Sequence, residues 1–244
     1  MWFVVRMRFM HPFILGVGLA ALASAADGAG VEGRAGAGRC PPPQAAVHEH
    51  FIAAGCADCW SQPEGTAAGA TAGGGGWRFD WIAPGGADAP LSTAALPEAQ
   101  ERLDRRGSPP PDDRQPTLLR QPAAAPPPAG LRLTVESGLP WAGYLGLQMR
   151  LSGSGRSALP PGSVGWLALV ELLPEGSEGS PVARALVRSV AGPLPLDSFR
   201  SGRGLSHLRA LRWPETALPE RLQARGWIEA ADGRMLAVAA DRCR

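Results

Sequence analysis

The stretch from Gly107 to Gly130, "GSPPPDDRQPTLLRQPAAAPPPAG", constrains the fold of this chain more than any other segment. It contains eight prolines, and proline lacks the backbone N–H that a helix interior or a central strand needs. We therefore expect a Pro-rich linker over residues 108–130, between one domain at 45–107 and a second at 131–244. A chain of 244 residues is long enough for two small domains.

The sequence after this linker has the pattern of an all-β module. Short apolar runs alternate with turn residues, and in "LRLTVES" from Leu131 apolar and polar side chains alternate as on a half-buried strand. Asp232-Gly233 lies between two such runs and predicts a two-residue hairpin turn. The pattern predicts an immunoglobulin-like β-sandwich. Large aromatic side chains are expected to supply its core volume, namely Trp141, Trp166, Trp213 and Trp227.

The first residues have the features of an export signal. Arg6 and Arg8 precede an almost wholly apolar run from Phe9 to Leu22, and "ASA" follows as a small-residue cleavage site. We expect cleavage after Ala25, which defines residues 1–25 as a signal peptide. The apolar run is too short for a spanning helix. The mature protein is therefore expected to be periplasmic or secreted, with a flexible segment at 26–44 and no membrane span.

The charge balance argues against nucleic acid as a partner. All 24 basic residues are Arg, and Lys and Asn are both absent, which indicates a GC-rich coding sequence rather than selection for arginine. Loss of the two signal-peptide arginines would leave as many Arg as Asp plus Glu, of which there are 22. A formally neutral mature chain has no long-range field to collect phosphates.

A pair of cysteines in "FIAAGCADCW" is the main candidate site. Cys56 and Cys59 have the spacing of redox-active dithiols, of metal clips and of small structural disulfides. The apolar run at 46–52 before them predicts a strand. "GGWRFDWIAP" predicts a second strand, because its aromatic residues recur at period two. "LPEAQERLDRRG" predicts a helix that begins near Pro97 and stops at Gly107.

The segment "VHEHFIAAGCADC" resembles the "VELFTSQGCSSC" signature of an uncharacterised family of secreted bacterial proteins. The resemblance implies an α+β chain with a reduced thioredoxin-like head followed by a β-rich domain. It also implies thiol-disulfide exchange with protein thiols and no cofactor. In that pattern Cys56 attacks and Cys59 resolves, and Pro116 in "RQPTLLRQ" is the proline whose cis peptide bond faces the dithiol.

Two departures from the family pattern predict at most weak oxidoreductase activity. The residues after Cys59 are rich in glycine, which destabilises the long helix that normally follows such a dithiol. Asp58 between the two cysteines adds a negative charge that disfavours a thiolate. An alternative is a non-catalytic binding or structural module in which the C-x-x-C is vestigial.

A third possibility is a metal site, since His48 and His50 share one face of the expected strand. Together with Cys56 and Cys59 they form a Cys2His2 set of the kind that copper or zinc accepts. The remaining cysteines, Cys40 and Cys243, permit a second disulfide, although four cysteines allow three connectivities. That bridge would close a loop of about 200 residues, worth about 5 kcal/mol in the chain-entropy model.

Overall fold

The structure is a computed structural model that describes residues 41–42, 45–62, 76–121, 130–155 and 158–242. Every described residue belongs to one compact unit, Ala35–Arg244. The expected signal peptide and the expected Cys40–Cys243 bridge therefore lie outside the described residues. Across those residues, no helix combines the length and the apolar character needed to cross a lipid bilayer.

Strands dominate the described part of the chain. The amino-terminal half contributes β1 (Val47–Ala53), α1 (Ala57–Ser61), β2 (Trp77–Ala83), α2 (Pro97–Arg105) and β3 (Thr117–Gln121). The carboxyl-terminal half contributes β4 (Leu131–Ser137), β5 (Tyr144–Gly153), β6 (Val164–Leu173), β7 (Arg184–Pro195), β8 (Leu205–Arg212), β9 (Leu222–Glu229) and β10 (Met235–Ala240). Three short 3-10 turns, at Ser92–Ala94, Ser177–Gly179 and Pro219–Arg221, complete the described elements.

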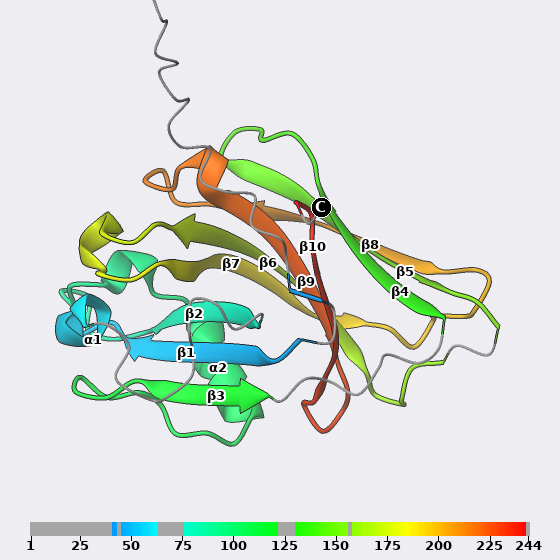
Figure 1. Cartoon of the computed structure of the whole chain (residues 1–244), viewed down its shortest axis with the longest axis horizontal. Helices are drawn as coiled ribbons and strands as arrows, with labels where there is room; N and C mark the ends of the chain where they lie inside the picture. The colour runs from blue at the N-terminus through cyan, green and yellow to red at the C-terminus, as the bar shows by residue number, and fades with distance from the viewer. Residues whose placement is uncertain (1–40, 43–44, 63–75, 122–129, 156–157, 243–244) are drawn as a thin grey trace, which may run out of the picture. The chain divides into compact units, whose positions relative to one another are not determined.

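These strands form two sheets, and the larger one draws on both halves of the sequence. Its seven strands lie in the order β10-β9-β6-β7-β2-β1-β3, and the smaller sheet has the order β4-β5-β8 (Figure 1). β1 pairs in parallel with β2 and antiparallel with β3. β2 pairs in parallel with β7, where Asp80 lies opposite Leu186. A single sheet therefore continues from one side of the Pro-rich segment to the other.

The predicted fold class, a reduced thioredoxin-like domain followed by an immunoglobulin-like sandwich, is wrong. Strand is the main regular structure of the described residues, which contain two α-helices, of which α1 is only five residues long. β2 pairs with β1 on one edge and with β7 on the other. Because β7 comes from the carboxyl-terminal half, no domain boundary separates the two halves at this point. The strands assigned to the sandwich are split, because β6, β7, β9 and β10 extend the sheet of β1–β3.

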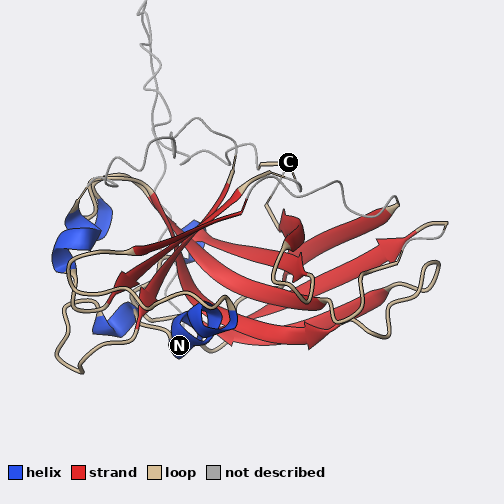
Figure 2. Ribbon diagram, turned by 90° about the horizontal axis from the view of Figure 1, so that it is seen from below, coloured by secondary structure: helices blue, strands red, loops and turns tan. Residues whose placement is uncertain are grey.

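Layers of buried side chains hold the two sheets and the helices together. The three-stranded sheet packs over the β6–β9 part of the larger sheet, where Leu147 and Met149 meet Leu167 and Ile228. Apolar residues of α2 lie in a second core with those of β1, β2, β6, β7 and β9. A third core surrounds α1 and includes Cys56, Cys59 and Trp60 together with Ile52, Ile82 and Leu186. Figure 2 shows the strong twist of the sheets.

Several local predictions are confirmed. The helix expected after Leu96 is α2, with Pro97 in its first turn. The hairpin expected at Asp232-Gly233 joins β9 to β10, but its turn spans residues 231–233 and not two residues, because the Ala230 N–H donates to the Arg234 carbonyl. Gly233 in this turn has a φ of 79°. Trp166 and Trp227 are buried as expected and stack on each other. Trp141 is the exception: 83% of it is exposed, so its prediction as a core residue is wrong.

Candidate functional site

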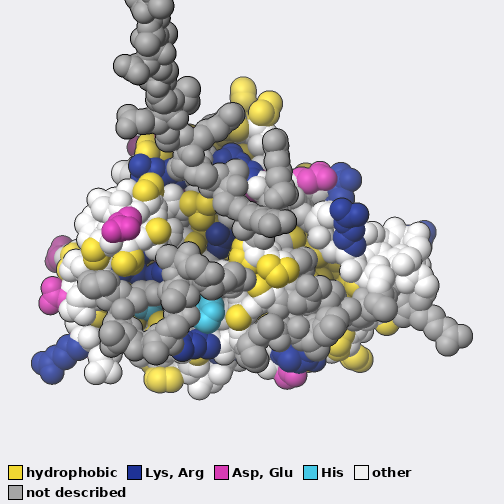
Figure 3. Space-filling model, viewed as in Figure 1, with side chains coloured by type: hydrophobic (Ala, Val, Ile, Leu, Met, Phe, Trp, Pro, Cys, Tyr) yellow, Lys and Arg dark blue, Asp and Glu magenta, His cyan; other side chains and the backbone are white. Residues whose placement is uncertain are grey.

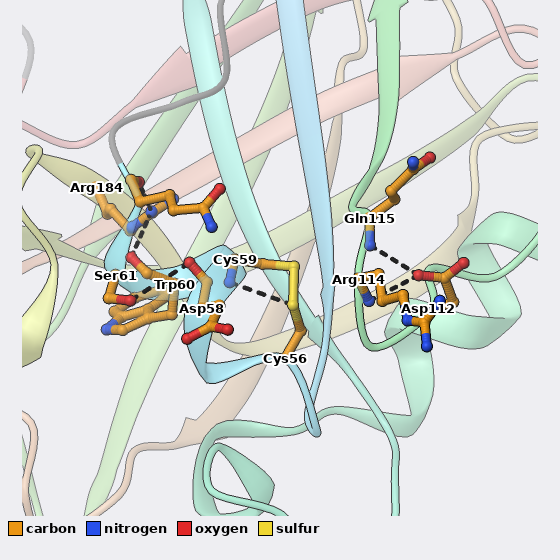
Figure 4. The surroundings of a disulfide bond; sticks show 10 residues. Cys56, Asp58, Cys59, Trp60, Ser61, Asp112, Arg114, Gln115 and Arg184 are labelled. Atoms are coloured by element: carbon orange, nitrogen blue, oxygen red, sulfur yellow. Dashed lines mark hydrogen bonds between the residues drawn. A yellow bond between two sulfur atoms is a disulfide. The ribbon is translucent and has the colours of Figure 1, made fainter.

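The Cys56–Cys59 disulfide lies at the carboxyl end of β1. β1 is buried and hydrogen-bonded on one side to β2 and on the other to β3. These two pairings fix the position at which β1 ends. After Ala53 the chain turns, and the N–H of Cys56 donates to the carbonyl of Ala53 at 2.9 Å. Cys56 then begins α1, and a disulfide joins it to Cys59 with their Cα atoms 5.2 Å apart (Figure 4).

The two half-cystines are buried although they lie in a surface turn. Cys56 is 2% exposed and Cys59 is 8% exposed, while Ala57 and Asp58 between them face the solvent. The backbone N–H of Cys59 donates to Cys56 Sγ at 3.2 Å. Cys56 Sγ therefore has a hydrogen-bond donor in place that would favour a thiolate on this sulfur.

A turn at residues 112–115 lies beside this site (Figure 4). Asp112 Oδ1 accepts from the N–H groups of Arg114 and Gln115, each at 2.7 Å, which fixes the shape of the turn. The carboxylate of Asp113 approaches Gly55 so closely that a Cβ at Gly55 would lie 2.2 Å from Asp113 Oδ1. Glycine at this position therefore allows the turn to pack against the chain just before Cys56.

Pro116 lies at the same end of the sheet as the disulfide. It immediately precedes β3, and Thr117 pairs with Phe51 near the end of β1. Among the described residues the cis peptide bond is Gly192–Pro193. The expectation of a cis bond before Pro116 is therefore wrong, because Gln115–Pro116 is trans.

Contacts from a distant strand hold the other end of α1. Arg184 at the start of β7 donates from Nη2 to the carbonyls of Trp60 at 2.8 Å and of Gln62 at 3.4 Å. Its guanidinium lies 4.6 Å from the centre of the Trp60 ring, and Trp60 Nε1 donates to the carbonyl of Glu178 at 2.6 Å. The short helix is therefore anchored to the carboxyl-terminal half independently of the disulfide.

Arg184 also belongs to a buried charge cluster around Asp80 of β2. The Asp80 carboxylate accepts from the N–H of Ala185 at 2.7 Å and from Arg78 at 2.8 Å, and it lies 3.2 Å from His50 Nδ1. Arg184 Nη1 lies 3.5 Å from it. Burial alone would raise the pKa of Asp80, but the hydrogen bond with His50 and the charge of Arg78 hold this pKa well below its usual range.

A second buried cluster joins β1, α2 and β9. Arg102 donates to both carboxylate oxygens of Glu49 and, at 2.7 Å, to Glu229. Its guanidinium lies between 5.2 and 5.9 Å from the ring centres of three tryptophans, Trp81, Trp166 and Trp227. Burial would lower the pKa of Arg102, yet the charges of the two glutamates raise it above its ordinary value. This cluster is a structural link between the two halves of the chain.

A third buried arginine, Arg225 of β9, lies over the rings of Trp77 and Phe79. Its Nη1 donates to the carbonyl of Arg78 on β2. Burial lowers the pKa of Arg225 to about 10, against the opposing charges of Asp80 and Asp241. The residue therefore remains charged at neutral pH and adds another polar link between strands of the two halves.

The residues proposed as metal ligands do not form a ligand set in the described structure. Within the described ranges no group of three or more His, Cys, Asp or Glu side chains is placed to hold a metal ion. Cys56 and Cys59 are bonded to each other. His50 faces Asp80 and has Arg184 Nη1 at 3.4 Å, so a cation already lies beside its ring nitrogen.

Sequence reasoning missed the buried charges that surround the site. A usable signal was present, because Glu49 in "VHEHFIA" and Asp80 in "WRFDWIA" are each the one acidic residue of a strand that ends in an apolar run. A carboxylate in such a position must be paired when the strand is buried on both faces. The partners Arg102, Arg184 and Glu229 lie far away in sequence, so the pattern predicts the need for a partner and not its identity.

Comparison with known proteins identifies the fold but no family. No protein-family model matches the chain, and no curated protein matches its sequence. Among solved structures, HBP35 of Porphyromonas gingivalis is similar with a TM-score of 0.51 and 10% identity, covering 83% of this chain and 76% of that one. Protein AGR_C_4864 from Agrobacterium tumefaciens has a TM-score of 0.41 and 15% identity, covering 80% of this chain and 92% of its own. The likeness to HBP35 concerns the fold alone.

Proposed function

We propose that the Cys56–Cys59 pair carries out reversible thiol-disulfide exchange with the thiols of a partner protein, after export directed by residues 1–25. The observation that carries this proposal is the hydrogen bond from the Cys59 N–H to Cys56 Sγ at 3.2 Å. The same donor would stabilise negative charge on Cys56 whenever the disulfide opens. Cys56 is therefore the sulfur best suited to attack and to leave.

The exchange starts from the disulfide form. A partner thiolate attacks Cys56 Sγ, which forms a mixed disulfide and releases Cys59 as a thiolate. A second partner thiolate then attacks the partner's sulfur in the mixed disulfide and releases Cys56. The partner gains a disulfide, the Cys56–Cys59 pair gains two electrons, and the two partner protons end on Cys56 and Cys59. In the reverse direction Cys56 attacks a partner disulfide and Cys59 resolves it.

The short loop favours redox chemistry over a purely stabilising bridge. Cys56 and Cys59 are three residues apart, and the chain-entropy model gives a four-residue loop only about 2 kcal/mol of stabilisation. The helix is also anchored by Arg184 and Trp60. A bridge at this position therefore contributes little that the surrounding contacts do not already supply.

Burial supports a second candidate, a non-catalytic module with a structural disulfide. Cys56 is 2% exposed, and the Asp113 carboxylate packs against Gly55 just before it. An attacking thiolate must reach the sulfur in line with the disulfide bond, so exchange requires the 112–115 turn to move. If the turn stays in place, the disulfide is inert.

The reduction potential distinguishes the two candidates. The full chain is equilibrated with glutathione or dithiothreitol buffers of known potential, and the Cys56–Cys59 thiols are alkylated and counted by mass spectrometry. Exchange predicts a potential above about −300 mV, because structural disulfides in secreted proteins lie below it. In addition, C59S should trap mixed disulfides with partner proteins through Cys56, and C56S is the matched control.

Two results would contradict the proposal. A potential below about −300 mV favours the structural module. Equal trapping by C56S and C59S would contradict the assignment of Cys56 as the attacking cysteine and Cys59 as the resolving one. Export is checked separately by mass spectrometry of the processed protein. Ala26 is the expected amino terminus, and a mature species that retains Met1 would contradict the periplasmic or secreted location.

A further inference from the structure

The outer edge of β8 is free of other strands in the described part of the chain. β8 is the last strand of the three-stranded sheet, beyond β5 (Figure 1). The N–H of Trp213 donates to the carbonyl of Gly143 at 3.2 Å, and peptide groups alternate in direction along an antiparallel strand. Leu208, Ala210 and Arg212 therefore point their N–H and C=O groups away from β5. Their N–H groups and the carbonyls of Ala210 and Arg212 line the free edge, whereas the carbonyl of Leu208 accepts from Arg209 Nη1 at 2.8 Å.

This edge is positively charged. From Ser198 to Pro214 the chain contains arginines and no Asp or Glu; they are Arg200, Arg203, Arg209 and Arg212, and all four are exposed. Figure 3 shows Arg side chains, with acidic side chains beside them, over the part of the molecule where Figure 1 places β4, β5 and β8. A second copy of β8 would bring like charges together across the new strand pair. An acidic strand would complement them.

Exposed apolar side chains also lie on the three-stranded sheet, one of them on β8 itself. Leu208 is 64% exposed, and Tyr144, which pairs with Arg212 across β5 and β8, is 47% exposed. Trp141 and Tyr144 close a tight turn through reciprocal backbone hydrogen bonds of 2.8 and 2.9 Å. Within it Ala142 has a φ of 49°, which is strained for a residue with a Cβ. The turn therefore holds Trp141 in the solvent within the β4–β5 hairpin, on the side of β5 that faces away from β8.

We propose that the edge of β8, residues 205–212, binds an extended acidic segment of a partner protein, which joins the three-stranded sheet as a fourth strand. Backbone hydrogen bonds to residues 208–212 supply affinity. Arg209 and Arg212 are three residues apart and thus lie on opposite faces of the strand, so they select acidic side chains at the same spacing. Leu208 receives an apolar side chain of the partner. This binding does not depend on the chemistry of the disulfide.

The test measures binding of a fluorescein-labelled octapeptide by anisotropy. The peptide has Glu at its third and sixth positions and Val or Thr elsewhere, and the control peptide has Lys in place of Glu. A210P removes an N–H from the free edge and leaves the β5 ladder intact, so we expect about tenfold weaker binding, equivalent to about 1.4 kcal/mol. R209E/R212E should also bind at least tenfold more weakly in low salt, and should bind the Lys peptide instead.

Controls and contrary outcomes make the test decisive. R132E, at an exposed position of β4 on the opposite edge of the sheet, should bind like the unmodified protein. Equal binding by A210P, with an unchanged circular dichroism spectrum, overturns strand addition. If A210P fails to fold, the charge reversal decides, and absence of a switch to the Lys peptide overturns the proposal.

Two other occupants of the edge are also tested. Vesicles containing phosphatidylglycerol that bind A210P as well as the unmodified protein, and lose binding with W141A, would assign the surface to a membrane. Dimerisation that A210P abolishes, followed by light scattering at increasing protein concentration, would assign the edge to a second copy. Either result overturns the proposed partner.

Discussion

Replacement of Arg102 by Met tests whether the buried cluster of Glu49, Arg102 and Glu229 joins the two halves of the chain. Arg102 is 1% exposed and holds both glutamates. Met preserves much of the apolar volume but leaves two carboxylates without their cation. Removal of one partner from a buried ion pair costs about 3 to 5 kcal/mol. We expect R102M to lose about 4 kcal/mol of its free energy of unfolding, of the order of half the stability of an ordinary domain.

Urea unfolding followed by tryptophan fluorescence measures this loss. The matched control is R105M on the same helix, since Arg105 is exposed and lies 5.2 Å from the Trp166 ring centre. It should cost no more than about 1 kcal/mol. The triple variant R102M/E49Q/E229Q should recover more than half of the loss, because its buried side chains are neutral. The reasoning fails if R102M costs less than about 1 kcal/mol, or if the triple variant is no more stable than R102M.

Three further predictions concern other parts of the molecule. The pKa of Asp80 is held well below its ordinary 3.8, so its ionised form stabilises the protein above about pH 4, and this contribution is lost as the pH falls below 3.8. Urea unfolding should therefore show that the stability difference between the unmodified protein and D80N shrinks below that pH. Removal of the disulfide in C56A/C59A should cost about 2 kcal/mol, and a loss above about 4 kcal/mol would identify a structural bridge. G192A places a Cβ 2.2 Å from Trp166 Cε3 and should lower the thermal midpoint by several degrees, whereas G86A, with nothing within 4 Å of its Cβ, should not.

The sequence alone predicts most individual elements of the amino-terminal half. β1, β2 and α2 lie within a residue or two of their expected ranges, because each has an apolar period and a clear stop signal such as Gly107. The C-x-x-C turn was also identifiable, since its spacing favours a local disulfide. These features depend on interactions between residues close together in the chain.

The way those elements assemble could not be predicted in the same way. β2 carries aromatic residues at period two, Trp77, Phe79 and Trp81. This pattern predicts a buried strand, but it is the same whether the paired strand is close in sequence or far away. Its actual neighbour, β7, begins 104 residues after Asp80. The Pro-rich segment predicted a boundary between two domains. The larger sheet nevertheless contains strands from both sides of this segment. The exposure of Trp141 could not be predicted either, because the residue type alone does not distinguish an exposed tryptophan from a buried one.

The pairing of β2 with β7 also determines when the sheet can form during synthesis. β1, β2 and β3 leave the ribosome well before residues 184–195 exist, so the edge of β2 must wait for a strand that is made much later. Sheets built from such distant segments fold slowly, in milliseconds to seconds, because a large loop must close first. During that interval the unpaired apolar edge is available to chaperones and to other nascent chains.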